Sequence, residues 1–167
     1  MEKKSTKLVQ RPTDQITYKV IGIAMEVHSR LGPGLKEAMY QKAMEEILEK
    51  SGLNYEGQRQ VEVYFGNRLV GLLFIDILVE ESIVVELKAL SHPVTNNEIA
   101  QVITYLKAEG ASVGLLLNFG RKYLEYNRIF PPKKITELTE KDLRFGVRLD
   151  ANSAKRRKRN QKDVFIR

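Results

Sequence analysis

The chain of 167 residues, with 43% hydrophobic and 29% charged residues, has the composition of one soluble globular domain with a substantial core. The absence of cysteine excludes disulfides, thiolate catalysis and cysteine-based zinc sites, and no apolar run is long enough to cross a membrane. The first residues lack the apolar core of a signal peptide, so we expect a cytoplasmic protein.

The net charge of +7 is concentrated at the two ends of the chain. Residues 1–12 have a net charge of +3 and residues 151–167 of +6, whereas residues 13–150 have −2. An acidic body between basic ends suits a phosphodiester substrate, although basic ends that only keep the protein soluble fit equally well. We therefore divide the chain into a flexible basic arm, a folded domain, a short extension and a disordered basic tail, at 1–12, 13–132, 133–150 and 151–167.

The first part of the domain is predicted to form two helices. The first begins near residue 13, at residue types that favour the N-cap, and continues to about residue 30 with apolar positions at helical spacing. It ends at Gly32-Pro33-Gly34, because proline cannot continue a helix. The second helix covers about 35–50 and ends at Ser51-Gly52.

Three strands are predicted to follow. Residues 55–65 alternate between apolar and polar types, as in a half-exposed strand, and Gly66-Asn67 forms a turn. The next two strands, 68–79 and 83–88, contain nearly continuous aliphatic runs, which indicates burial on both faces. The short connections favour antiparallel pairing.

A helix at about 97–108, a buried strand at 113–119 and an edge strand at 123–130 complete the predicted domain. A short helix is expected within the extension, at about 139–143. This order predicts an α/β sandwich, with helices around a mixed sheet.

Three charged residues interrupt the aliphatic strands: Asp76, Glu86 and Lys88. Burying a charge costs roughly several kcal/mol unless the charge is paired or bound to a metal. Because side chains alternate along a strand, Glu86 and Lys88 point to the same face. If the two strands pair, Asp76 lies beside Glu86, and the pattern predicts a pocket for a divalent cation and a water.

Asp76, followed after nine residues by Glu86-Leu87-Lys88, resembles the core signature of the PD-(D/E)XK nuclease superfamily. Ile75 stands at the proline position of that signature, which is often replaced. The predicted order of elements also resembles the common core of this superfamily. The resemblance therefore implies a restriction-endonuclease-like α-β-β-β-α-β fold with a mixed central sheet flanked by helices.

Two further motifs extend the resemblance. Gln101 and Tyr105 are similar to the Gln-x-x-x-Tyr motif of the exonuclease-like branch. Gly34, Glu37 and Tyr40 resemble the motif that names the GxxExxY protein family. Together the motifs span roughly residues 16–130 and occur in the expected order on the expected elements.

The resemblance implies a metal-dependent nuclease that uses Mg²⁺ or Mn²⁺, with DNA favoured over RNA as substrate. By resemblance, Asp76 is the central metal ligand, Glu86 the second, and the Leu87 carbonyl a third. Lys88 would orient or help to deprotonate the attacking water and stabilise charge on the phosphate. Glu37 would act as an additional ligand or as an acid beside the ligands.

The remaining candidates would position groups or bind the substrate. By resemblance, Gln101 and Tyr105 would position water, Lys88 or the phosphate through hydrogen bonds. The basic run in the tail also resembles a nuclear-localisation run, but contact with nucleic acid is favoured. Its residues are Lys155, Arg156, Arg157, Lys158 and Arg159.

Each candidate also has a structural interpretation. Asp76 fits a turn or an edge strand, Glu86 and Lys88 fit a surface ion pair, and Glu37 fits a helix cap. Gln101 and Tyr105 fit the polar surface of a helix. The alternative function is a non-catalytic nucleic-acid-binding or protein-interaction module that retains the nuclease fold. We expect so small a domain to need a second copy, as a homodimer, or a partner protein to form a DNA-binding cleft.

Overall fold

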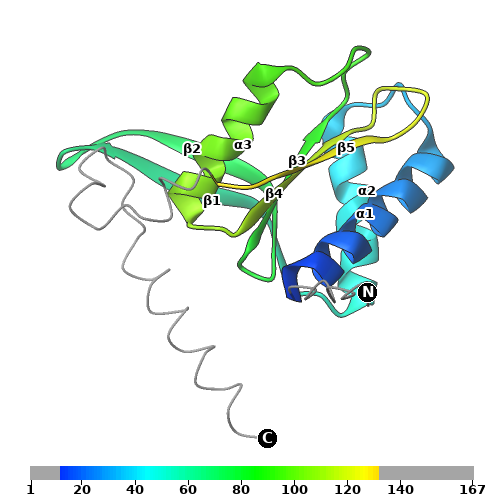
Figure 1. Ribbon diagram of the computed structural model, residues 1–167, viewed down its shortest axis with the longest axis horizontal. Coiled ribbons are helices and arrows are strands. Elements are labelled where there is room, and N and C mark those ends of the chain that lie inside the picture. The colour runs from blue at the N-terminus through cyan, green and yellow to red at the C-terminus, as the bar shows by residue number, and fades with distance from the viewer. Residues whose placement is uncertain (1–11, 132–167) are drawn as a thin grey trace, which may run out of the picture.

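Three helices and five strands make up residues 12–131, the part of the chain that the computed structural model describes (Figure 1). The elements are α1 (Pro12–Leu31), α2 (Glu37–Ser51), β1 (Tyr55–Phe65), β2 (Arg68–Val79), β3 (Ile83–Lys88), α3 (Asn96–Glu109), β4 (Val113–Asn118) and β5 (Glu125–Ile129). Each corresponds to a predicted element, with ends that differ by a few residues. The predicted helix at 139–143 lies outside the described residues.

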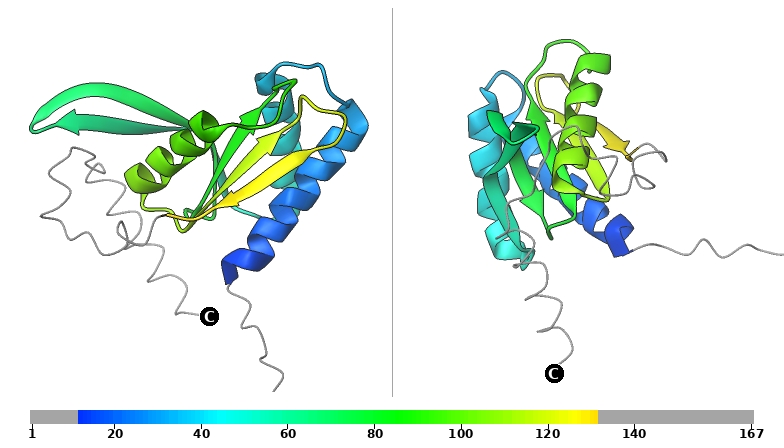
Figure 2. Two further views of the ribbon diagram at one scale, coloured as in Figure 1. Left: turned by 45° about the horizontal axis from the view of Figure 1, so that its top comes forward. Right: turned by 90° about the vertical axis from the view of Figure 1, so that its left-hand side faces the viewer.

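The strands form one mixed sheet in the order β1-β2-β3-β4-β5. Neighbouring strands are antiparallel except β3 and β4, which are parallel and are joined through α3. Helices α1 and α2 cover one face of the sheet, and α3 covers the other (Figure 2). The predicted α/β class, with helices flanking a mixed sheet, is therefore confirmed.

Strand β3 lies at the centre of the sheet and is buried on both faces, as its aliphatic sequence predicts. Val85 and Leu87 pack toward α1 and α2, whereas Val84 packs toward α3. Glu86 has the same parity as Val84, so its side chain is directed to the α3 side of the sheet. Burial of β3 thus places a carboxylate inside the protein.

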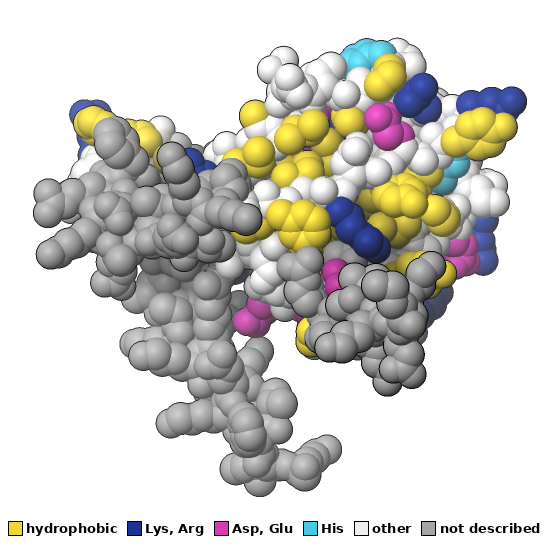
Figure 3. All heavy atoms as spheres, viewed as in Figure 1, with side chains coloured by type: hydrophobic (Ala, Val, Ile, Leu, Met, Phe, Trp, Pro, Cys, Tyr) yellow, Lys and Arg dark blue, Asp and Glu magenta, His cyan; other side chains and the backbone are white. Residues whose placement is uncertain are grey.

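The prediction of burial on both faces is wrong for the first half of β2. Strands β1 and β2 form a long hairpin that extends beyond the other strands (Figure 2), and hydrophobic side chains are visible on its surface (Figure 3). Leu72 is 43% exposed and Phe74 is 47% exposed. The reason is that β3 pairs with β2 only over Ile77–Val79. The earlier residues of β2 have β1 as their one strand neighbour among the described residues.

None of the helices in residues 12–131 is both long enough and apolar enough to span a bilayer.

Close packing of α3 on β4 predicts an effect of changing Gly114. A Cβ atom at this position would lie 2.3 Å from Cγ1 of Val102, which is fully buried and stiff. We expect Gly114→Ala to lower the free energy of unfolding by about 1–3 kcal/mol, measured by chemical denaturation. The matched control is Gly22→Ala on the exposed side of α1, where a Cβ meets nothing within 4 Å. This control should raise stability by up to ~1 kcal/mol, and equal effects of the two changes would contradict the packing argument.

Candidate active site

Asp76 lies where the pairing between β2 and β3 ends. The β2–β3 ladder covers Ile77–Val79 and ends at Ile77, the residue after Asp76. There the Asp76 carboxylate takes the place of a backbone partner, because its Oδ2 accepts a hydrogen bond from the Leu87 N–H at 2.8 Å. Burial raises the pKa of Asp76, the Leu87 hydrogen bond and Lys88 lower it, and the net shift is upward. The two strands therefore hold the Asp76 carboxylate close to the residues of the Glu86-Leu87-Lys88 motif.

Glu86 is a buried carboxylate that is only half satisfied. The residue is 3% exposed, and its Oε1 accepts a hydrogen bond from Lys88 Nζ at 2.7 Å. Its Oε2 is buried and has no hydrogen-bond partner among the described residues. Burial first, and then the charge of Asp76, raise the pKa of Glu86 to about 7, although Lys88 acts in the opposite direction. A buried carboxylate with one oxygen that lacks a hydrogen-bond partner is suited to binding a cation.

The donor set fits Mg²⁺ or Mn²⁺ better than a metal that needs many protein ligands. Within residues 12–131, no three His, Cys, Asp or Glu side chains form a group that could hold a metal ion. Mg²⁺ is usually bound by one or two carboxylates, while water and substrate phosphate complete its coordination. Asp76 and the unpaired oxygen of Glu86 would supply two such carboxylates.

Lys88 completes the charged group. Its side chain is 15% exposed and forms an ion pair with Glu86. Burial lowers the pKa of Lys88, but the hydrogen bond to Glu86 and the negative charges of Glu86, Glu37 and Asp76 outweigh this effect. The net result is a pKa of Lys88 above its ordinary value.

Glu37 is the first residue of α2, and its carboxylate faces the segment that follows β3. Its Oε1 accepts a hydrogen bond from the Ala89 N–H at 3.2 Å, and its charge helps to raise the pKa values of Asp76 and Glu86. Glu37 therefore lies beside Asp76 and Glu86, at the start of the segment that follows β3.

Tyr40, one turn along α2, has a structural position. It is fully buried and stacks on Phe119 at 4.6 Å between ring centroids. Its hydroxyl donates to the Gly32 carbonyl at 2.7 Å and accepts from the Leu35 N–H at 3.1 Å. Tyr40 therefore fixes the turn from which α2 begins, and with it the position of Glu37.

Gln101 and Tyr105 lie on the side of α3 that faces these charges. Gln101 Nε2 donates a hydrogen bond to the Tyr105 hydroxyl at 2.7 Å. Tyr105 is buried, which raises its pKa, and the charges of Glu86 and Asp76 raise it further. The structure thus places Gln101 and Tyr105 beside the charged residues of β2 and β3.

The segment after Lys88 is held by contacts that the sequence did not indicate. Asn118 is fully buried, and its Oδ1 accepts hydrogen bonds from the N–H groups of Leu90 at 2.9 Å and Gly120 at 3.1 Å. Gly120 lies so close that an added Cβ would be 2.4 Å from the Leu90 carbonyl oxygen. The end of β4 therefore fixes the chain that leaves β3.

Two glutamines near Asp76 were also absent from the predicted site. Gln41 on α2 donates a hydrogen bond to the Asp76 carbonyl oxygen at 3.1 Å, and Gln58 on β1 donates to Gln41 at 2.7 Å. No recognisable motif marks either residue. The five basic residues predicted at 155–159 lie outside the described residues.

The buried Glu86 carboxylate predicts a pH-dependent stability in the metal-free protein. A raised pKa means that the contribution of Glu86 is fully present below its ordinary value of 4.5 and is lost as the pH rises through about 7. We expect the unfolding free energy of the wild type, relative to Glu86→Gln, to fall by about 3 kcal/mol over this range. Chemical denaturation in a chelator at several pH values measures the difference. Parallel stability curves would contradict the prediction.

Comparisons with known proteins identify the family of this chain. The sequence matches the family model of the PD-(D/E)XK nuclease superfamily over residues 14–129. No curated protein matches the chain. A solved structure, "Crystal structure of SSO0001", is similar, with 20% identity and a TM-score of 0.47, over 64% of this chain and 56% of that chain. This protein thus spans a little over half the length of that one. Because the family match covers most of the chain, the protein belongs to the PD-(D/E)XK nuclease superfamily.

Proposed function

We propose that this protein is a metal-dependent nuclease that hydrolyses phosphodiester bonds, with DNA as the favoured substrate. The observation that supports this most directly is the buried Glu86 Oε2, which has no hydrogen-bond partner among the described residues and lies beside Asp76 and Lys88. A buried charge left in this state costs stability, and a bound cation would offset that cost. The superfamily suggests nuclease activity, and this donor set suits it.

In the proposed mechanism, Asp76 and Glu86 hold Mg²⁺ or Mn²⁺, with the Leu87 carbonyl as a third ligand. The ion, when bound, would neutralise charge on the phosphate and make a bound water more acidic. Asp76 is oriented for this role by the Leu87 N–H, and Glu86 by its ion pair with Lys88.

Lys88 acts in this proposal as a cation that stabilises the charge developing on the phosphate. Its pKa lies above the ordinary value in the metal-free protein, because the surrounding carboxylates outweigh its burial. The ion pair with Glu86, at 2.7 Å, holds the Lys88 ammonium beside the two carboxylates and supports this electrostatic role. Tyr105 and Gln101, hydrogen-bonded to each other, would position the water or the phosphate from the α3 side.

We also propose that the protein is of the GxxExxY type. Gly34 lies in the turn before α2, and Glu37 and Tyr40 lie on α2. Their contacts suggest that they act together. Tyr40 fixes the turn that contains Gly34, and Glu37 then reaches the Ala89 N–H next to Lys88. The motif would therefore connect the start of α2 to the end of β3.

Substitution of the charged group provides the main test. Asp76→Ala, Glu86→Ala and Lys88→Ala should each lower the cleavage rate by roughly 100-fold or more in Mg²⁺ or Mn²⁺, since each removes a ligand or a charge at the reacting phosphate. The assay uses linear, circular and single-stranded DNA and RNA, and EDTA should abolish cleavage.

The matched control for these variants is Glu46→Ala. Glu46 forms an exposed ion pair with Lys50 on the outer side of α2, so its removal should leave cleavage and folding unchanged. Thermal unfolding confirms that each variant is folded. Unchanged cleavage in folded Asp76→Ala and Glu86→Ala would refute the nuclease proposal.

A second function, binding without cleavage, is favoured by the net charge of +6 in residues 151–167. Deletion of these residues should weaken DNA binding and reduce its salt dependence, because each phosphate contact contributes about −0.9 to the slope of log K against log salt. For a nuclease, the deleted protein should still cut at high enzyme concentration. Binding that survives EDTA, without cleavage by the wild type, would instead identify a binding module.

A further inference from the structure

The pairing between β1 and β2 is interrupted opposite Asp76. The ladder runs from Tyr55 to Gly57, omits Gln58 and resumes at Arg59, although the register is the same on both sides. Gln58 has a φ of +50°, in the left-handed region that non-glycine residues rarely adopt. Such a conformation is unfavourable and persists only where the surrounding structure requires it. The residues around Gln58 must therefore stabilise this backbone conformation.

Asp76 consequently lies at a break in the pairing on both sides. The β2–β3 ladder stops at Ile77, and the β1–β2 ladder omits the position facing Asp76. In place of a strand partner, the Asp76 carbonyl oxygen accepts a hydrogen bond from Gln41 Nε2 at 3.1 Å. On the side chain, the Leu87 N–H donates a hydrogen bond to Oδ2.

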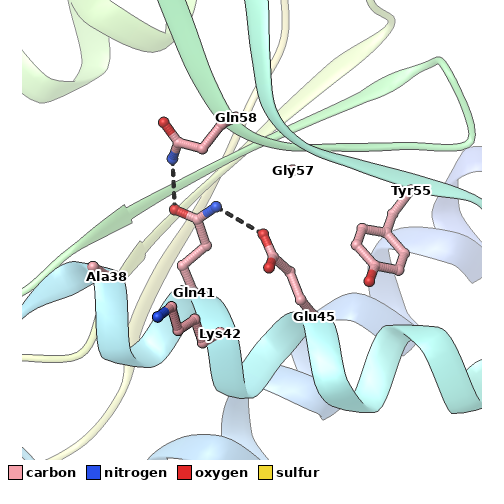
Figure 4. Close-up of a pocket in the computed structure, with 7 residues that line it drawn as sticks. All are labelled: Ala38, Gln41, Lys42, Glu45, Tyr55, Gly57 and Gln58. Atoms are coloured by element: carbon pink, nitrogen blue, oxygen red, sulfur yellow. Dashed lines mark hydrogen bonds between the residues drawn. The ribbon is translucent and has the colours of Figure 1, made fainter.

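The two glutamines are linked to each other and to α2. Gln58 Nε2 donates to Gln41 Oε1 at 2.7 Å, and Gln41 Nε2 donates to Glu45 Oε1 at 2.7 Å (Figure 4). The Gln41 amide nitrogen thus donates to two acceptors, and the amide oxygen accepts from one donor. These partners determine the orientation of the amide. Gly57 allows this arrangement, because a Cβ there would lie 2.3 Å from Glu45 Oε1.

A purely structural role explains these residues poorly. Gln58 is exposed, and both amides lie at the edge of an open hollow of about 600 Å³ between α2 and β1, whose lining residues are shown in Figure 4. They therefore fill no core, and the left-handed Gln58 backbone is unfavourable for the fold. What the pair does is bond to Asp76: Gln41 donates to the Asp76 carbonyl oxygen, and Gln58 in turn donates to Gln41.

We propose that Gln41 and Gln58 are positioning residues that hold Asp76 in the orientation required of a metal ligand. This inference rests on the proposed function. It adds that the α2–β1 side of the site, which has no part in the Asp76, Glu86 and Lys88 motif, determines how Asp76 is presented. Residues that orient ligands in this way typically change metal affinity by about 10–100-fold when they are substituted.

The test uses the full-length chain with Gln58→Gly and Gln41→Ala. Gln58→Gly removes the side chain and also the backbone strain, so the melting temperature should stay the same or rise. Mn²⁺ affinity, measured by titration calorimetry, should nevertheless fall by about 10–100-fold in both variants. Gln58→Asn, which keeps an amide and tolerates the left-handed region, should recover part of the affinity. A loss of stability in step with metal affinity in Gln58→Gly would overturn the proposal.

A second measurement needs neither metal nor activity. Because Asp76 Oδ2 accepts the Leu87 N–H, a misoriented carboxylate should speed hydrogen exchange of the Leu87 amide, by roughly tenfold, in metal-free protein. The amides of Val84 and Val85, within the paired part of β3, should not change. The matched control is Lys42→Ala, which alters the same hollow without altering these hydrogen bonds.

The two measurements separate the possible failures. Unchanged Leu87 exchange and unchanged Mn²⁺ affinity in both glutamine variants would overturn the positioning role. If the wild type neither binds Mn²⁺ nor cuts nucleic acid, the proposed function fails. Faster Leu87 exchange in the variants would in that case still support the positioning of Asp76, and unchanged exchange would still refute it.

Discussion

The burial of the Glu86 carboxylate at the end of a central, aliphatic strand, beside the partly buried Asp76 and Lys88, is the constraint on which this site depends. Glu86 is buried with one oxygen paired to Lys88 and the other unpaired among the described residues, and Asp76 is bonded to the backbone of the same strand. Burial, and then the charge of Asp76, raise the pKa of Glu86 to about 7. Such a site is unfavourable when empty, and a divalent cation would relieve it.

The surrounding elements hold this unfavourable arrangement in place. The end of β4 fixes the segment after Lys88 through Asn118, the start of α2 reaches the same segment through Glu37, and α3 contributes Tyr105. On the remaining side, the amide of Gln41 reaches the main chain of Asp76. Elements from both faces of the sheet therefore converge at the point where the pairing of β2 with β3 ends.

Much of the fold was predictable because it follows from local patterns. Helical spacing, the turn residues and the aliphatic run of β3 each identified their element, and three charges within aliphatic sequence indicated the site. Burial along β2 was not predictable in the same way. Leu72 and Phe74 resemble buried strand residues, but their exposure depends on how far β3 extends beside them, which the residues of β2 do not reveal.

The sequence by itself determined the class of fold, the superfamily and the charged residues, because these depend on residue types at short spacings along one or two elements. Only the tertiary structure decided which oxygen of Glu86 is left unpaired and that Lys88 pairs with the other. It also brought Gln41 and Gln58 to Asp76 from two other elements. These properties arise from contacts between residues distant in the chain and from the removal of water, and neither is encoded in a local pattern.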